Sequence, residues 1–547
     1  MKRRIIKELG SLRLPLMGGF VAASFVAFFK HVERMVVTGE FAGFLLALSS
    51  FALVACFALI PALIFGVEFQ SGTLPLLLSQ PIERSRIWKE KLLVGLAALC
   101  VIGGFLGLVH ELLKLPAGIN FTTAVIDALW PGHEIIAERR TELDNGGYWL
   151  LGMTFMLATL CSAGLWTLTA GSTIGGAVLS LASQFLPILA LVAILERFEV
   201  AEPTQMRIIE AAALLYSGIF YWLGYRKFKR FELRQGTASE AGLSGKAHGF
   251  FGSIGGEWLR CRPTGAMTNF IRKELWLHKP LFMIAGLLTG GWLITFLLFC
   301  LQPGRKEFYD GVFVGLTAVY IALITVLAAV LPLGEERALN LADWQLTLPM
   351  SRTIQWGMRL GIALVVMIGL GFLVPLVLSW IISGQTTVGL YYAIREKDTG
   401  LLLLLFFAVG LFSMGFWAIN VVQNTVRAVV TSLVIVPCIY GLGAASAQLA
   451  REFGGAESQL LMVLYSNGLI SLHEAGSFDW GRFIFVTSSV VLIAIALIQS
   501  LRSFRRPEHT RREMVRSALA FVLAAVVLGL WVGDLIQSIV SIQSMVR

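Results

Sequence analysis

Long apolar segments separated by polar stretches recur along the whole chain. About thirteen are present, each close to the roughly 20 residues that a helix needs to cross the hydrocarbon layer of a bilayer. They lie at roughly 16–29, 41–66, 92–113, 148–171, 174–195, 208–225, 281–301, 311–333, 360–383, 400–420, 428–448, 482–501 and 517–538. Because backbone in lipid must satisfy its own hydrogen bonds, this pattern predicts an all-α polytopic membrane protein.

Charged residues are scarce and lie at the edges of the apolar segments. Only 14% of the 547 residues are charged, whereas about a quarter of a soluble domain is charged. The net charge of +10 does not indicate nucleic-acid binding, since no basic surface interleaved with aromatic residues accompanies it. With a cytoplasmic N-terminus, the inside stretches hold most of the 44 Lys and Arg residues, as the positive-inside rule requires. We therefore expect a multi-pass protein of the cell (cytoplasmic) membrane.

Two polar stretches, one near the start and one past the middle, have the same layout. Both follow a long apolar segment and both fall on the cytoplasmic side of the expected topology. At one constant offset, residues of the first stretch match residues of the second: Gly66, Glu68, Leu78, Pro81, Arg84, Trp88 and Lys91 correspond to Gly334, Glu336, Leu346, Pro349, Arg352, Trp356 and Arg359. A repeat of this size predicts two copies of one membrane module in parallel orientation.

The beginnings and ends of the two halves also match. Lys7-Glu8-Leu9 and Lys273-Glu274-Leu275 open them, and basic segments at 225–232 and 501–508 close them. The expected division is a first six-helix repeat at 1–232, a Gly/Ser-rich cytoplasmic linker at 233–268, a second repeat at 269–508, and an additional thirteenth helix within 509–547.

The first polar stretch resembles the ABC-2 type permease family. In that family a Glu and a Gly-Thr pair after the second helix lead into a Leu-rich turn that ends in Pro-Ile-x-Arg, as Glu68, Gly72-Thr73 and Pro81-Ile-Glu-Arg84 do here. In the second half the match is weaker, because Leu341 stands where the first half has Thr73.

The resemblance implies the permease subunit of an ATP-binding cassette transporter, formed by two fused half-permeases, with one chain per complex. It also implies that the two matching stretches are coupling elements that contact an ATP-binding subunit. Their residues would be Glu68, Gly72, Thr73, Leu77, Pro81, Arg84, Trp88, Glu336, Leu346, Pro349, Arg352 and Trp356. Connecting helices at the membrane surface would span 1–13 and 269–279, with Lys7, Glu8, Lys273 and Glu274.

The chain has no nucleotide-binding motif of its own. Gly245-Lys246 is followed by Ala247, whereas a phosphate-binding loop needs Ser or Thr there to reach Mg²⁺. We therefore expect the chain itself to be neither an enzyme nor a cofactor-binding protein, with ATP and Mg²⁺ held by a separate subunit, expected as a dimer. Since few charges lie within the apolar segments, a hydrophobic or amphipathic exported substrate is favoured.

Two other interpretations remain open from the sequence. The polar stretches also fit ordinary cytoplasmic loops with a positive-inside composition. A chain of this kind could be a non-transporting membrane scaffold or regulator of an ATPase. The Glu335-Glu336 pair occurs in intramembrane metalloproteases as well, but no later segment supplies the histidines that such a zinc site requires.

Overall fold

The computed structural model describes residue 10, Leu12–Val26, 39–70, 73, 82–112, 145–198, 202–230, 265–301, 306–338, 350–382, 400–422, 424–436, 438–439, 480–505, 516, 518–524 and 526–527. These ranges are helical, with short turns between some of them and no strand. Nine helices within them are long and apolar enough to cross a membrane. The protein is therefore a multi-pass membrane protein of the all-α class.

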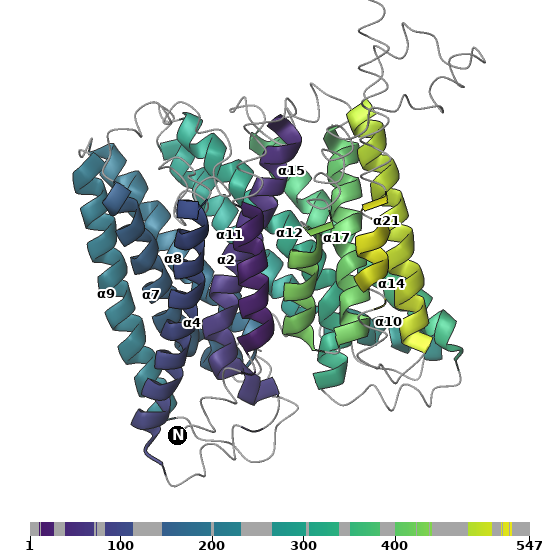
Figure 1. The fold of residues 1–547 in the computed structure, drawn as a ribbon, viewed down its shortest axis with the longest axis horizontal. Helices are drawn as coiled ribbons and strands as arrows, with labels where there is room; N and C mark the ends of the chain where they lie inside the picture. The colour runs from purple at the N-terminus through teal and green to yellow at the C-terminus, as the bar shows by residue number, and fades with distance from the viewer. Residues whose placement is uncertain are drawn as a thin grey trace, which may run out of the picture.

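The principal helices stand roughly side by side as one layered bundle (Figure 1). They are α2 (Gly39–Gln70), α4 (Arg84–Leu112), α7 (Asn145–Ala170), α8 (Thr173–Arg197), α9 (Glu202–Lys229), α10 (Ala266–Leu277), α11 (Lys279–Leu301), α12 (Lys306–Ala338), α14 (Arg352–Val366), α15 (Val374–Ile382), α17 (Gly400–Val422) and α21 (Trp480–Arg505). Two shorter apolar helices span Leu12–Val26 and Thr425–Val436.

Helices α14 and α15 form one continuous rod through a π-helical stretch at Met367–Leu373. The amide of Val374 donates to the carbonyl of Gly369, five residues earlier, which is the wide hydrogen bond that defines this geometry. In α4 the helix runs from Arg84 to Leu112 with no such stretch.

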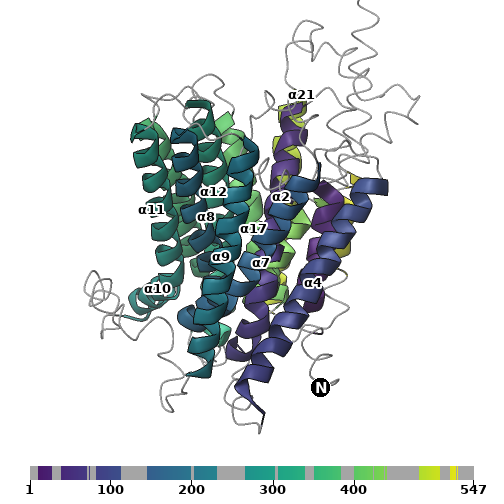
Figure 2. The same ribbon diagram turned by 90° about the vertical axis from the view of Figure 1, so that its left-hand side faces the viewer.

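Helices α2 and α12 lie at the centre and α9 at the edge. Within their apolar windows, 78% of α2 and 83% of α12 are buried, against 17% of α9. Helix α9 packs along α7, and α21 packs along α17 (Figures 1 and 2). Helix α2 is apolar on every side, as expected for a helix enclosed by others rather than exposed to water.

Every predicted apolar segment is helical where the structure describes it, but the helix ends differ from the expected ones. Helix α2 continues to Gln70 and α4 already begins at Arg84. Likewise, α12 continues to Ala338 and α14 begins at Arg352. Charged residues expected in polar stretches therefore lie within helices, which is possible because their side chains find partners inside the bundle.

Two glycines let helix ends approach closely. A Cβ atom at Gly66 would lie 3.0 Å from the Cα of Thr173, at the start of α8. A Cβ at Gly334 would lie 2.8 Å from the Cγ2 of Thr425, at the start of the next short helix. In each case a central helix touches the beginning of another helix, and any larger side chain would separate the two.

We predict that Gly66→Leu lowers the midpoint of thermal unfolding, because overpacking a close contact costs about 1–3 kcal/mol. Gly286→Leu in α11 is the control, since a Cβ there meets nothing within 4 Å. Thermal unfolding of both purified variants in detergent checks this. Equal midpoints for the two variants would contradict the close contact.

Candidate functional site

At one end of the bundle, α2 and α12 finish while α4 and α14 begin; we call this the ion-pair end. It contains two clusters of matching residues. The first junction comprises Glu68, Arg84, Trp88 and Lys91, and the second junction comprises Glu336, Arg352, Trp356 and Arg359. Each joins the end of one span to the start of the next across a connecting segment, 71–81 or 339–349, that lies outside the described residues apart from Thr73.

A buried ion pair forms the centre of the first junction. The Nζ of Lys91 lies 3.3 Å from Oε1 of Glu68, and both side chains are 4% exposed. The same ammonium donates to the carbonyl of Ile64 at 2.6 Å. Because both charges are removed from water, separating them would leave a buried unpaired charge, so the pair keeps the start of α4 beside the end of α2.

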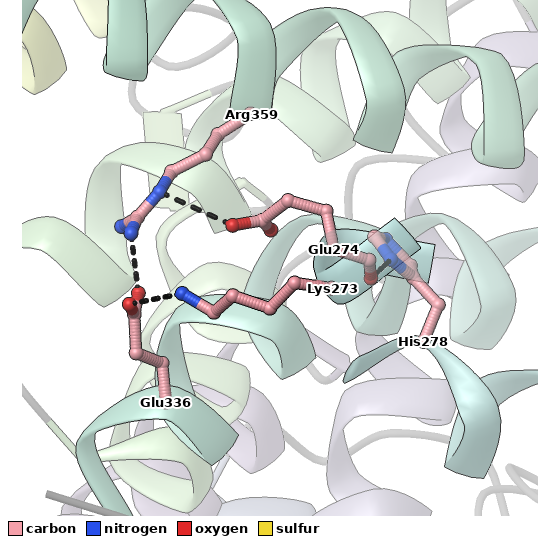
Figure 3. Close-up of polar contacts among 5 residues, drawn as sticks. All are labelled: Lys273, Glu274, His278, Glu336 and Arg359. Carbon is pink, nitrogen blue, oxygen red and sulfur yellow. Dashed lines mark hydrogen bonds and ion pairs between the residues drawn. The ribbon is translucent and has the colours of Figure 1, made fainter. Parts of the chain in front are cut away.

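An ion network forms the centre of the second junction (Figure 3). The Nη2 of Arg359 lies 2.6 Å from Oε2 of Glu336. The Nζ of Lys273 lies 2.8 Å from the other oxygen of that carboxylate. The Nε of Arg359 lies 3.4 Å from Oε1 of Glu274. Two cations and two carboxylates thus connect α10, α12 and α14.

The two junctions carry different cations at the same position. An ammonium is a compact charge, whereas the planar guanidinium can address two acceptors along different edges. Arg359 contacts two carboxylates in this way, and Lys91 contacts the Glu68 carboxylate and the carbonyl of Ile64. The Phe270 and Phe504 rings also lie 5.9 and 5.4 Å from the Arg359 guanidinium, close enough for cation–π attraction.

An arginine at each junction binds the end of a further helix. The Nη1 of Arg84 donates to the carbonyl of Lys229 at 2.7 Å, and the Nη1 of Arg352 donates to the carbonyl of Arg505 at 2.6 Å. The last carbonyls of a helix lack partners within the helix, and a cation there also complements the helix dipole. The starts of α4 and α14 are thereby fastened to the ends of α9 and α21.

A tryptophan packs at the same place in each junction. Trp88 is fully buried against Phe65 and Phe228, with ring centroids 4.7 and 5.4 Å away. Trp356 packs against Phe416 at 6.1 Å and donates from Nε1 to Ser500 at 3.1 Å. Trp88 thus packs α4 against α2 and α9, and Trp356 packs α14 against α17 and α21.

Burial changes the titration of two groups on and beside α10. Loss of hydration raises the pKa of Glu274; Arg359 lowers it, Glu336 raises it and Lys273 lowers it. His278, between α10 and α11, is 0% exposed, and burial lowers its pKa, while backbone carbonyls of Glu274 and Ala328 favour its charged form. The neutral imidazole thus stabilises the turn from α10 into α11.

The structure divides the predicted coupling residues into two groups. Glu68, Trp88 and Glu336 are buried within the bundle, at 3%, 0% and 1% exposure, so they cannot touch a soluble partner. The amide of Thr73 donates to the carbonyl of Glu68 at 3.0 Å and begins the connecting segment. The predicted residues that lie outside the described ranges are Lys7, Glu8, Gly72, Leu77, Pro81, Leu346 and Pro349.

The predicted connecting helix at 269–279 corresponds to α10, and Lys273 and Glu274 both face the second junction (Figure 3). Their ion pairs with Glu336 and Arg359 were not anticipated from the sequence. The packing roles of Phe228 and Ser500 were missed as well. For Phe228 a signal was present, because the matching segments 225–232 and 501–508 each carry a phenylalanine at the same place.

Other candidate chemistry finds little support in the described ranges. They contain no group of three His, Cys, Asp or Glu residues placed to hold a metal ion. Gln184 lies in a neutral network, donating to Ser162 at 3.1 Å and accepting from Thr159 at 3.1 Å. Hydrogen bonds of this kind are typical of contacts between membrane helices.

No protein-family model matches the chain, and neither a curated protein nor a solved structure matches it.

We predict that Arg359→Met strongly destabilises the protein, by about 3–5 kcal/mol, because Glu274 would lose its cation while remaining buried. Adding Glu274→Leu should restore part of the loss. Arg86→Met, which breaks the pair with Glu90 on a side chain that is 63% exposed, should cost at most about 1 kcal/mol. Unfolding midpoints of the three variants check this; similar losses for Arg86→Met and Arg359→Met would contradict it.

Acidification should destabilise the protein through His278. In the folded protein the pKa of His278 lies below the ordinary value of 6.5. The contribution of its neutral imidazole to the free energy of unfolding is therefore fully present above pH 6.5. It is lost as the pH falls from 6.5 through the lower folded-state pKa, because the unfolded chain binds the proton more readily. One such group changes the free energy of unfolding by at most about 1.4 kcal/mol per pH unit. Glu274, with its raised pKa, contributes in the opposite sense.

The measurement is the unfolding midpoint between pH 7.5 and 5 for the wild type and for His278→Gln. The wild type should fall more steeply, because the variant keeps Glu274 and lacks only the imidazole. Parallel curves would show that His278 does not control this dependence.

Proposed function

We propose that this chain is the permease subunit of an ATP-binding cassette transporter, built from two fused ABC-2 type repeats. A separate pair of ATP-binding subunits would supply ATP hydrolysis from the cytoplasm. The exported substrate would be hydrophobic or amphipathic. The observation that carries the proposal is the pair of junctions. At each junction, ion pairs join the two spans that flank a polar connecting segment.

A coupling element must transmit force rather than bend. If α2 and α4 were joined only by the backbone of the segment between them, a force from a soluble partner would bend that segment and would not move the helices. The Glu68–Lys91 contact of 3.3 Å and the Arg84 bond to the end of α9 join the two helix ends that flank the segment into one rigid group. Displacement of the segment would then tilt that whole group.

The recurrence of contacts supports the duplication. The ion pair Glu68–Lys91 recurs as Glu336–Arg359. An arginine binds a distant helix end in both halves, and a glycine of the central helix touches a threonine in both halves. Independent loops with a positive-inside composition would have no reason to reproduce three kinds of contact in the same order. Two such elements suit a two-fold ATP-binding dimer.

The substrate class is inferred from the spans. Polar groups such as Gln184 are neutral and already bonded to neighbouring hydroxyls. The charged networks described above gather at the ion-pair end. A strongly charged cargo would need compensating charges at membrane depth, so an apolar or amphipathic cargo fits better.

The first experiment is purification of the tagged full-length chain from its native membrane under gentle extraction. We expect an ATP-binding subunit to accompany it in stoichiometric amount. If no ATP-binding subunit accompanies the chain, the transporter proposal fails. If one does accompany it but no lipophilic compound stimulates its ATPase activity, the alternative of a non-transporting membrane scaffold or regulator is favoured.

Coupling is tested in the reconstituted complex with Lys91→Met and with the exchange Glu68→Lys plus Lys91→Glu. We expect Lys91→Met to keep the ATP-binding subunit but reduce substrate-stimulated ATPase about tenfold or more, and the exchange to recover part of it because the ion pair is re-formed. Arg86→Gln, at the exposed start of α4, is the matched control. Unchanged stimulation in Lys91→Met would contradict a role of the first junction in coupling.

A further inference from the structure

The ends of α4 and α9 at the ion-pair end carry an exposed group of cations, which we call the basic patch: Lys89, Arg226, Lys229 and Arg230. Arg84 brings the two helix ends together through its bond to the carbonyl of Lys229, and the ends lie close in Figure 2. Within the described ranges, no carboxylate forms an ion pair with any of the four patch residues. Four exposed cations thus lie on two helix ends that Arg84 joins.

The patch continues directly from surfaces that face lipid. On α9, Leu215, Ile219, Trp222 and Arg226 follow one another at helical spacing along one stripe. Leu215, Ile219 and Trp222 are 67%, 47% and 54% exposed, and α9 is the least buried of the nine spans. The stripe therefore passes from acyl-chain depth to the level of the headgroups, where the cations begin.

Trp222 marks that level. Its ring lies 5.3 Å from the guanidinium of Arg226, and tryptophan side chains are enriched where hydrocarbon meets headgroups. On α4 the same order occurs, with Lys89 preceding Leu93 and Leu96, which are 64% and 45% exposed. Along both helices, exposed apolar side chains are thus followed by cations. A phospholipid has the same order, with acyl chains followed by a phosphate.

At the matching positions that the structure describes, the second half differs from the first. Gly357 stands where the first half has Lys89, and Ile498 stands where it has Trp222. The guanidinium of Arg505, which matches Lys229, donates to Thr353 at 3.0 Å. Ordinary topology signals would not require an exposed tryptophan next to these cations in the first half.

We propose that the basic patch binds the phosphate-bearing headgroup of an anionic phospholipid of the bilayer, with its acyl chains along the exposed stripes of α4 and α9. The cations supply the electrostatic attraction that basic segments exert on anionic lipids. Trp222 holds Arg226 at headgroup depth. The inference requires only that the bundle spans a membrane and does not rest on transport.

The test compares retention of phosphatidylglycerol and phosphatidylcholine by the purified full-length chain, measured by native mass spectrometry during lipid titration. We expect the wild type to prefer phosphatidylglycerol and Arg226→Gln plus Arg230→Gln to weaken that binding about tenfold. The matched control is Arg427→Gln plus Arg502→Gln, which removes two exposed cations from the second half and should leave binding unchanged.

Three outcomes would overturn the inference. The first is equal phosphatidylglycerol binding by the wild type and the patch variant. The second is full displacement of the lipid by soluble glycerol phosphate, which would indicate a site for a free phosphate. The third is unchanged lipid retention with loss of a co-purifying protein, which would assign the patch to protein docking. Unfolding midpoints equal to that of the wild type establish that the variants are folded.

Discussion

Pairing of buried charges at the ends of α2 and α12 is the interaction on which the rest of this end of the bundle depends. Glu68 and Glu336 lie where a central helix leaves the apolar layer, and an unpaired carboxylate at that depth would be very costly. Lys91 and Arg359 neutralise them from the next span. Arg84 and Arg352 each lie about two helical turns before those cations, and they reach the ends of α9 and α21.

The two junctions use the same plan, with a buried cation of the following span beside the carboxylate of the central helix. At the second junction the structure also describes α10, and its residues Lys273 and Glu274 join the network. A helix that precedes α11 is thereby bonded to the helices on both sides of the second connecting segment. A shift of α12 or α14 would therefore also act on α10, which ends beside the buried His278.

Periodicity and composition predicted the helical class and the position of each apolar segment, because a continuous run of apolar residues has few alternatives in lipid. They did not predict where the helices end. Charges such as Arg84 and Lys91 resemble loop residues in sequence, and only their partners, Lys229 and Glu68, reveal that they belong to a helix. The matching positions identified the junction residues, but pairings between distant segments, such as Trp356 with Ser500, depend on tertiary packing that local patterns do not encode.

The π-helical stretch at Met367–Leu373 has a geometric consequence for the rod that begins at the second junction. In an α-helix each residue advances the side chains by about 100°, so one additional residue within a widened turn rotates all that follows by that angle. The face that α15 presents to its neighbours is thus offset from the face that α14 presents. The side chains of α14 and those of α15 can therefore pack against different neighbouring helices along one continuous rod. Helix α4 has no such stretch, so its contact face follows the ordinary helical repeat over its whole length.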